Sequence, residues 1–221
     1  MISIIIPIYN GIEFIDQSVM SIINQTYKNW ELLIGINGHL KDSEVYMKAK
    51  KYETISTKIK VIDFHNIKGK SKTLNEMLKY CNPKYSHVAL LDVDDMWHID
   101  KLRQQCQYLD KFDVVGTQCI YFGDINGISP SIPLGIITHF DFKSVNPIIN
   151  SSVVLRKELC YWDDESGIDG VEDYDLWLRL KRDGKHFFNI KDIYVYHRIH
   201  NTSSFNSKGN GNLVNIILKK Y

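Results

Sequence analysis

Short runs of apolar, mostly β-branched residues alternate along the first half of the chain with segments in which apolar residues recur every three to four positions. This alternation is typical of α/β domains, in which helices cover both faces of a mostly parallel, Rossmann-like central sheet. The pattern predicts strands over residues 3–8, 30–36, 60–64 and 87–91, and helices over residues 12–23, 41–52 and 70–80.

The second half of the chain is less regular. The predicted elements there are strands over 114–122 and 151–155, an amphipathic helix over 171–182 and a short strand over 193–196. Ser, Asn and Gly dominate residues 202–211, which predicts a mobile tail, and an apolar and basic stretch follows at 213–220. Pro7 lacks a backbone N–H, so the hydrogen-bonded pairing of the first strand is expected to end there.

The composition is that of an ordinary globular protein. The chain has 221 residues, 44% of them apolar, which is enough for one sizeable core. Its 27 Lys and Arg residues against 26 Asp and Glu leave a formal charge of +1, and the lysines are spread along the chain. A protein that binds a nucleic-acid backbone needs a concentrated basic surface, so no nucleic-acid partner is expected.

The apolar runs are short. The longest, residues 2–8 and 87–91, cannot cross a bilayer, and the N-terminus lacks a charged region followed by a cleavage site. The sequence therefore predicts a soluble, cytoplasmic protein, with the stretch 213–220 open to peripheral contact with a membrane. The four cysteines show no C-x-x-C spacing and are expected to be free thiols.

An acidic cluster follows the apolar run 87–91. Asp92, Asp94 and Asp95 stand where a buried strand ends, which is where open α/β sheets place ligand-binding groups. Neighbouring carboxylates raise one another's pKa unless a cation compensates them, and oxygen ligands suit Mg²⁺ or Mn²⁺. The alternative is a solvated turn that caps a helix beginning near Ile99.

Two other phosphate chemistries fit the sequence poorly. A phosphatase of the haloacid dehalogenase type would carry its acidic motif after the first strand, whereas this cluster follows the fourth. Gly69-Lys70-Ser71 matches the end of a P-loop, but no glycine stands five residues before Gly69.

Five motifs occur in a fixed order along residues 2–203 and together resemble family 2 glycosyltransferases of the GT-A fold. They are an opening strand at 4–10 (IIIPIYN), an S-x-x-x-Q-T-Y segment at 21–27, a D-x-D-D-x-W-H block at 92–102, an E-D block at 171–179 and a closing histidine motif at 196–203. The resemblance implies a single GT-A domain, with a nucleotide-binding half over 1–118 and an acceptor half over 119–221. It also implies transfer of a sugar, with inversion, from a nucleotide-diphosphate sugar to a hydroxyl of a carbohydrate or lipid-linked acceptor in glycan synthesis.

The resemblance also assigns donor-binding residues. Asp92 would hold the ribose, and the residues bordering the nucleobase would be Pro7, Tyr9 and Asn10. The family usually has an Asp where this chain has Asn37, so a UDP-sugar is implied but the choice of base stays open. Leu74 replaces a common arginine, so Lys70 or Lys72 is expected to supply positive charge to the phosphates.

The implied metal ligands are Asp94, Asp95 and His200, which would hold Mn²⁺ or Mg²⁺ against the departing diphosphate. Asp173 would be the catalytic base that takes the acceptor proton, with Glu172 beside it on the acceptor side. The start of a helix near Gly170 favours the ionised carboxylate that a base requires. Without the resemblance, Glu172 and Asp173 would be interpreted as ordinary helix-capping residues.

Several aromatic and acidic positions have a simpler interpretation. Trp97 and Trp177 are expected in the core, and Asp175 is expected to face solvent or a neighbouring arginine. Trp162, beside two aspartates in a loop, is the candidate for stacking on an acceptor sugar ring.

Two other functions remain open from the sequence. A sugar-nucleotide pyrophosphorylase shares a related sheet and uses Mg²⁺, but it carries a Gly-rich basic loop where this chain has Tyr9-Asn10-Gly11. A non-catalytic module that binds nucleotide sugars is compatible with the departures at Asn37 and Leu74.

Overall fold

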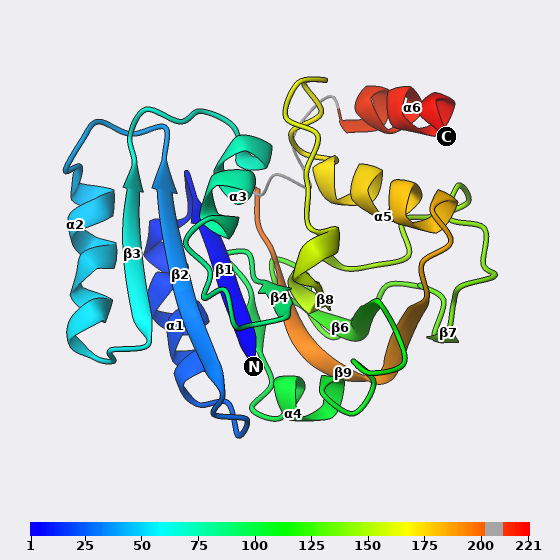
Figure 1. Ribbon diagram of the computed structural model, residues 1–221, viewed down its shortest axis with the longest axis horizontal. Coiled ribbons are helices and arrows are strands. Elements are labelled where there is room, and N and C mark those ends of the chain that lie inside the picture. The colour runs from blue at the N-terminus through cyan, green and yellow to red at the C-terminus, as the bar shows by residue number, and fades with distance from the viewer. Residues whose placement is uncertain (202–209) are drawn as a thin grey trace.

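The computed structural model describes residues 1–201 and 210–221, and in these residues the strands form one twisted sheet of nine. Its first part is parallel, as the alternating pattern predicted. The strands run in the order β3 (Ile59–Phe64), β2 (Trp30–Asn37), β1 (Ile2–Ile8) and β4 (His87–Leu90). All four strands therefore end at the same edge of the sheet (Figure 1).

The rest of the sheet mixes directions. Its strands are β8 (Val154–Arg156), β6 (Val114–Gly123), β9 (Phe187–Ile199) and β5 (Met96–Trp97), with β7 (Gly135–Ile136) pairing to β9. Strand β8 is antiparallel to both β4 and β6, whereas β6 and β9 are parallel. The expected boundary between halves at residue 118 falls inside β6, and the sheet is continuous across it.

Helices cover both faces of this sheet, which confirms the predicted fold class. One face carries α1 (Ile15–Ile23), α2 (Glu44–Lys50) and α4 (Lys101–Gln105), and the other carries α3 (Lys70–Leu78) and α5 (Glu172–Arg182). Helix α6 (Asn210–Lys220) lies outside α5 (Figure 1). Short 3-10 turns complete the path at Ile12–Phe14, Lys51–Thr54, Asn150–Ser152 and Lys157–Leu159.

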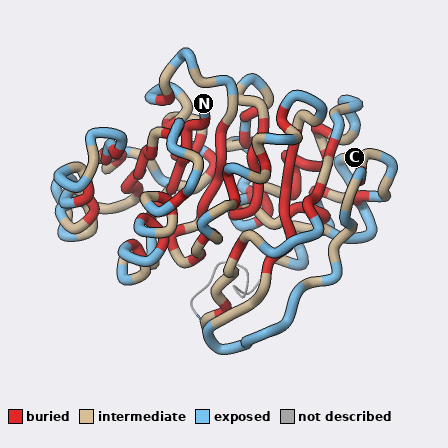
Figure 2. The backbone as a smooth tube through the Cα atoms, turned by 90° about the horizontal axis from the view of Figure 1, so that it is seen from below, coloured by how far each residue is buried: buried red, intermediate tan, exposed pale blue. Residues whose placement is uncertain are grey.

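Strand β1 shows why the sheet is buried on both sides. Ile4 and Ile6 pack toward α1, while Ile5 belongs to the core under α3 and α5, and all three are fully buried. Burying an aliphatic side chain of this size contributes about 2 kcal/mol relative to leaving it exposed. The buried strands through the centre of the molecule are visible in Figure 2, with exposed backbone at the periphery.

The S-x-x-x-Q-T-Y segment has a structural explanation. Gln25, fully buried after α1, donates to the backbone oxygen of His98 at 2.8 Å and accepts from the backbone N–H of Leu102 at 3.0 Å. Ser21 Oγ accepts from the backbone N–H of Trp97 at 3.1 Å. These contacts attach α1 to the chain that leaves the acidic cluster, so the second motif supports the third.

Three local predictions were wrong. The first strand does not end at Pro7 but continues to Ile8 beside β2. Its pairing with β4 has already ended at Ile5, so no strand on that side requires the N–H that Pro7 lacks. The expected short strand at 193–196 is the centre of β9, since pairing with β6 extends it. The expected strand at 151–155 begins as a 3-10 turn, and only Val154–Arg156 pairs.

The end of the chain is only partly described. Most of the expected mobile tail, residues 202–209, lies outside the described residues, whereas residues 210 and 211 begin α6. One side of α6 packs on the second core through Ile217, and Ile216 is exposed. All four cysteines are free thiols. Within the described parts of the chain, no helix has the length and apolarity needed to span a membrane.

Candidate active site

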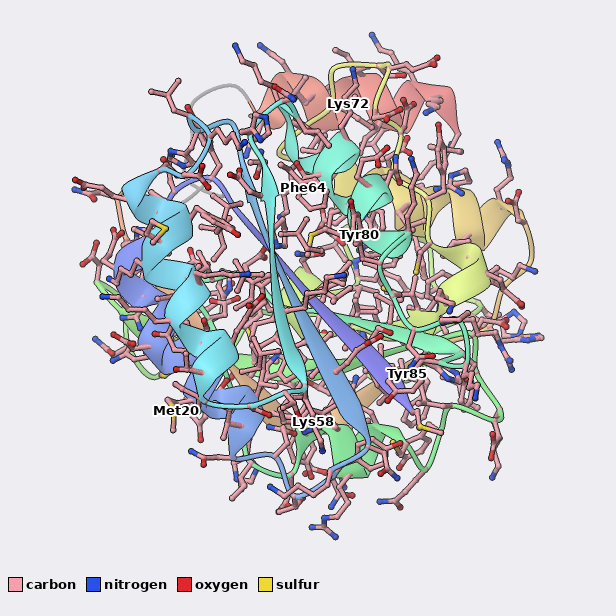
Figure 3. All side chains as sticks on the ribbon, turned by 60° about the vertical axis from the view of Figure 1, so that its left-hand side comes forward. Met20, Lys58, Phe64, Lys72, Tyr80 and Tyr85 are labelled. Atoms are coloured by element: carbon pink, nitrogen blue, oxygen red, sulfur yellow. The ribbon has the colours of Figure 1, made fainter. Side chains whose placement is uncertain are left out.

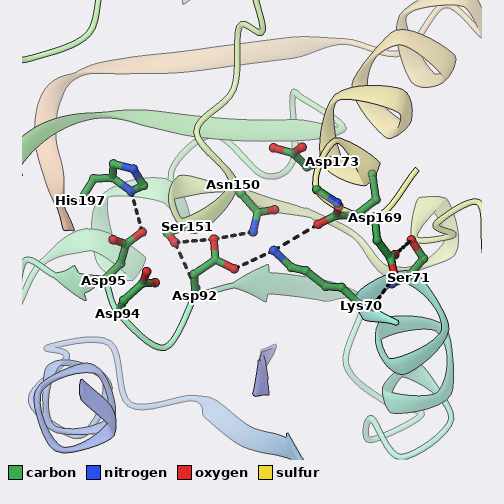
Figure 4. Close-up of polar contacts among 12 residues, drawn as sticks. Lys70, Ser71, Asp92, Asp94, Asp95, Asn150, Ser151, Asp169, Asp173 and His197 are labelled. Atoms are coloured by element: carbon green, nitrogen blue, oxygen red, sulfur yellow. Dashed lines mark hydrogen bonds and ion pairs between the residues drawn. The ribbon is translucent and has the colours of Figure 1, made fainter. Parts of the chain in front are cut away.

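The acidic cluster lies at the carboxyl ends of the parallel strands, directly after β4. Loops from the second half of the chain and the first turns of α3 and α5 meet it there (Figure 4). Because these segments are distant in sequence, the cluster is completed only by the folded chain.

Asp92 is held in one orientation by three partners. Its Oδ1 atom lies 2.9 Å from Nζ of Lys70, and its Oδ2 atom accepts from Asn150 at 2.9 Å and from Ser151 at 3.3 Å. Burial would raise the pKa of Asp92, but the Lys70 charge and the hydrogen bonds from Asn150 and Lys70 lower it below its usual value. Asp92 is therefore an ionised and oriented acceptor.

Lys70 joins this aspartate to the start of α5. Its Nζ atom also lies 3.1 Å from Oε1 of Glu172. Burial would lower the pKa of Lys70, but the carboxylates of Asp92 and Glu172 raise it well above its usual value. Lys72, the other lysine considered for phosphate binding, is exposed on α3 (Figure 3).

Asp95, the second expected metal ligand, is bound to β9. It is fully buried, and its Oδ2 atom lies 2.9 Å from Nδ1 of His197 while its Oδ1 atom accepts from the backbone N–H of Arg198 at 2.8 Å. Burial would lower the pKa of His197, but Asp95 raises it to about 9. With a partner at each oxygen, Asp95 fixes β9 to the acidic cluster.

Asp94 and His200 lie side by side, with Nε2 of His200 2.9 Å from Oδ2 of Asp94. Burial and the carboxylates of Asp95 and Asp92 raise the pKa of Asp94 to about 6. A divalent cation would relieve that repulsion, and a carboxylate with an imidazole is a donor pair that Mn²⁺ accepts. Asp94 and His200 are therefore the candidate metal ligands of this cluster, and each Asp95 oxygen already has a partner on β9.

Asp173 lies in the first turn of α5, on the other side of Lys70. Burial and Glu172 raise the pKa of Asp173 to about 7, while Lys70 opposes the shift. The helix N-terminus was expected to favour the ionised carboxylate, but burial opposes ionisation and the pKa of Asp173 lies above its usual value. A pKa near 7 is suited to a group that takes up a proton during a reaction. Asn146 donates to its Oδ2 atom at 3.4 Å.

Three further expectations were wrong because the side chains are buried. Glu172 is 2% exposed and binds Lys70 and the backbone N–H of Gly170, so it is unavailable to an acceptor. Trp162 is fully buried in the second core and cannot stack on a sugar. Asp175 is also fully buried, and its Oδ1 atom lies 3.0 Å from Nζ of Lys220 and from the Tyr221 hydroxyl rather than facing solvent or an arginine.

The residues proposed for the nucleobase lie at the ends of β1 and β2. The Tyr9 ring is 57% exposed and packs over Gly38, where an added Cβ would lie 2.8 Å from the ring. His39 stands 5.4 Å from the same ring, centroid to centroid. Asn10 is exposed, and Asn37, 4% exposed, is the last residue of β2. Pro7 precedes them in β1 and is partly exposed.

The sequence analysis missed Asn150, Ser151 and Asp169 as parts of this site. No local pattern in the sequence marks Asn150 or Asp169 as a site residue. A separate cavity of about 360 Å³ lies at the opposite edge of the sheet. Lys58, Tyr80 and Tyr85 are among its lining residues (Figure 3). It contains none of the site residues described above.

Comparison with known proteins places the chain in a family. The sequence profile of glycosyl transferase family 2 matches residues 3–161, well over half of the chain. This chain belongs to glycosyl transferase family 2. The match includes the opening strand and the acidic cluster after β4, and it ends before α5.

Two bacterial relatives show the level of similarity. The chain is 34% identical over 189 residues to the UDP-Glc:alpha-D-GlcNAc-diphosphoundecaprenol beta-1,3-glucosyltransferase WfgD of Escherichia coli, covering 83% of this chain and 70% of that protein. It is 30% identical over 207 residues to the putative glycosyltransferase EpsE of Bacillus subtilis, and the match covers 86% of this chain and 70% of EpsE. The bifunctional glycosyltransferase pgtA of Dictyostelium discoideum is 28% identical over 238 residues, and the match covers 88% of this chain but only 31% of pgtA.

Solved structures share the fold at low sequence identity. Residues 1–349 of S. aureus TarS, in complex with UDP-GlcNAc, superpose with a TM-score of 0.75 and 17% identity, covering 98% of this chain and 65% of TarS 1–349. The mannosyltransferase PcManGT of Pyrobaculum calidifontis, in complex with GDP-Man and Mn²⁺, gives a TM-score of 0.69 and 12% identity. The match covers 92% of this chain and 58% of PcManGT.

Proposed function

We propose that this chain is an inverting glycosyltransferase that moves a sugar from a nucleotide-diphosphate donor to an acceptor hydroxyl. The observation that carries the proposal is the position of Lys70. Its ammonium touches Asp92, two residues before the cation-binding candidate Asp94, and Glu172, one residue before the base candidate Asp173. This lysine thus joins the proposed donor-binding residue Asp92 to the first turn of α5, which carries the proposed base.

Asp173 is the proposed base. Its pKa of about 7 means that a substantial fraction is ionised at neutral pH and can take the proton of an acceptor hydroxyl as that oxygen attacks the sugar. Lys70 helps to keep Asp173 ionised and offers positive charge to the departing diphosphate. Asp92, ionised and oriented, is the proposed ribose ligand.

Asp94 and His200 would hold Mn²⁺ or Mg²⁺. The bound ion would stabilise the negative charge that develops on the diphosphate leaving group. His197 and Asp95 keep the neighbouring backbone of β9 in place, so that His200 remains beside Asp94.

A UDP-sugar is the proposed donor, held by residues 1–118 with Tyr9 and Asn37 near the base. The name of the E. coli relative specifies UDP-Glc, and TarS binds UDP-GlcNAc, which supports this choice. The name of that relative also specifies a diphosphoundecaprenol-linked sugar as acceptor, so a lipid-linked carbohydrate bound by residues 119–221 is proposed here. Such an acceptor would bring a cytoplasmic enzyme to a membrane surface.

A thermal-shift panel tests the proposal. UDP, GDP and their sugars are added to the purified chain with and without Mn²⁺, because a ligand that binds only the folded state raises stability. UDP or a UDP-sugar should raise the melting temperature, and more so with Mn²⁺. Slow hydrolysis of the stabilising donor should follow. Tight binding without any turnover of donor would instead identify a non-catalytic binding module.

A further inference from the structure

Asp169 caps a helix that lies about a hundred residues earlier in the chain. Its Oδ2 atom accepts from the backbone N–H of Lys70 at 3.0 Å. Its Oδ1 atom accepts from the backbone N–H and from the hydroxyl of Ser71, at 3.0 and 2.8 Å. The first N–H groups of α3 have no partner within the helix, so the loop before α5 supplies one (Figure 4).

Gly69 makes room for this contact. It is the residue at the N-terminal boundary of α3 and has no side chain to cap the helix itself. Its φ angle is +96°, and a Cβ built on it would lie 2.5 Å from Oδ2 of Asp169. A side chain at position 69 would therefore displace the Asp169 carboxylate, in addition to the backbone strain of a positive φ.

The first residue of α5, directly after this loop, holds the other end of Lys70. Nζ of Lys70 lies 3.1 Å from Oε1 of Glu172, and Oε2 of Glu172 accepts from the backbone N–H of Gly170. Asp169 thus binds the backbone of Lys70, and Glu172, three residues after Asp169, binds its ammonium. These contacts close a ring between α3 and the start of α5.

We propose that Asp169 is a positioning residue for glycosyl transfer, because capping α3 fixes Lys70 relative to Asp173 at the start of α5. This inference rests on the proposed function of Asp173 as the base. The hydrogen bonds of Asp169 go to Lys70 and Ser71, so it acts through the backbone of Lys70.

A measurable consequence follows from the charges around Asp173. Glu172 on its own helix and Asp92 after β4 raise its pKa, and Lys70 on α3 opposes them. If Lys70 moves away when the cap is lost, Asp173 should take up its proton at higher pH. The acidic limb of the rate profile should then move upward, an effect that a uniform loss of folded protein would not produce.

The experiment compares Asp169→Ala and Gly69→Ala with Glu165→Ala, which removes an exposed carboxylate from the same loop. Both cap variants should lower kcat about tenfold, with the acidic midpoint of the pH profile raised by about one unit. Glu165→Ala should match the wild type in both. An unchanged midpoint in Asp169→Ala, with the loss of rate explained by unfolded protein, would overturn the inference.

Two further measurements separate this inference from the proposed function. Hydrogen exchange at the amides of Lys70 and Ser71 should accelerate in Asp169→Ala, and unchanged exchange would show that no cap exists. Asp169→Asn retains one oxygen for Ser71. Its rate of hydrogen exchange and the acidic midpoint of its pH profile should lie between those of the wild type and Asp169→Ala. This variant replaces Asp169→Ala if the latter does not fold. If Asp173→Asn transferred sugar at the wild-type rate, Asp173 would not be the base. The hydrogen-exchange measurement would still show whether Asp169 caps α3.

Discussion

The ammonium nitrogen of Lys70 lies 3.1 Å from Oε1 of Glu172, which joins α3 in the first half of the chain to α5 in the second. The side chain of Glu172 is only 3% exposed, so its charge depends on this partner. The same ammonium lies 2.9 Å from Oδ1 of Asp92. One lysine thus pairs with two carboxylates on different elements, and both the stability and the proposed chemistry depend on it.

Replacing this lysine should cost stability. Lys70→Ala is expected to lower the free energy of unfolding by about 3 kcal/mol, because Glu172 is left buried and without its cation. Urea denaturation measures the change. Lys72→Ala, on the exposed side of α3, is the control and should remain within about 0.5 kcal/mol of the wild type. If adding Glu172→Gln to Lys70→Ala recovered none of the loss, the pairing would not be its cause.

The proposed base is tested by Asp173→Asn. An amide cannot take up the acceptor proton, so transfer should fall by about 10² to 10⁴ while binding of the donor nucleotide is unchanged. Initial rates with a UDP-sugar and calorimetric titration with UDP give the two quantities. Asp183→Asn, an exposed carboxylate at the other end of α5, should transfer normally. Near wild-type turnover by Asp173→Asn would exclude it as the base.

The pH dependence follows from the same residue. Burial raises the pKa of Asp173 to about 7, and only the ionised form can act as a base. The rate at low substrate should therefore increase with pH through about 7 and fall about tenfold for each unit below it. A profile that stays flat from about pH 5.5 to about pH 8.5 would contradict the assignment.

Stability should show the opposite trend for this group. The folded chain retains the Asp173 proton to higher pH than the unfolded chain does. The contribution of Asp173 to the free energy of unfolding therefore decreases as pH rises from its unfolded value, about 3.9, to about 7. Asp173→Asn should remove that component from the pH dependence measured by urea denaturation. An unaltered pH dependence in the variant would mean that the carboxyl is solvated in the folded chain.

Metal binding is tested at Asp94 and His200. Asp94→Ala should abolish most of the extra thermal stabilisation by UDP in the presence of Mn²⁺, since a ligand at a hundred times its dissociation constant contributes about 2.7 kcal/mol. His200→Ala should weaken the effect less, because one carboxylate remains. The control is Asp124→Ala, an exposed residue just after β6. Full Mn²⁺-dependent stabilisation of Asp94→Ala would place the cation elsewhere.

The contact between α5 and α6 gives a prediction away from the chemistry. Lys220 lies 3.0 Å from the buried carboxylate of Asp175, so Lys220→Ala should destabilise the fold by about 1 to 2 kcal/mol. The exposed neighbour Lys219→Ala is the control for loss of charge. Equal denaturation curves for the two variants would show that the Tyr221 hydroxyl alone satisfies Asp175.

The sequence alone determined much of the fold and the position of the acidic cluster. Apolar periodicity predicted the four parallel strands, helices α1 and α3 and the start of α5. It did so because a strand or helix that faces a core repeats its apolar pattern locally. The residues after β4 could be placed at the edge of the sheet for the same reason. Trp97 and Trp177 were correctly expected in the core.

Tertiary structure decided which side chains meet. Asp169 reaches Ser71 across 98 positions, and Lys70 reaches Glu172 across a similar separation, so no local spacing reveals either pair. Burial separated the roles of adjacent carboxylates: Asp95 turns inward to His197, while Asp94 stays beside His200. Trp162 was assigned to a sugar because a loop was assumed to be exposed. Contact and burial are properties of the packed chain, and a sequence pattern records them only where they repeat along a single element.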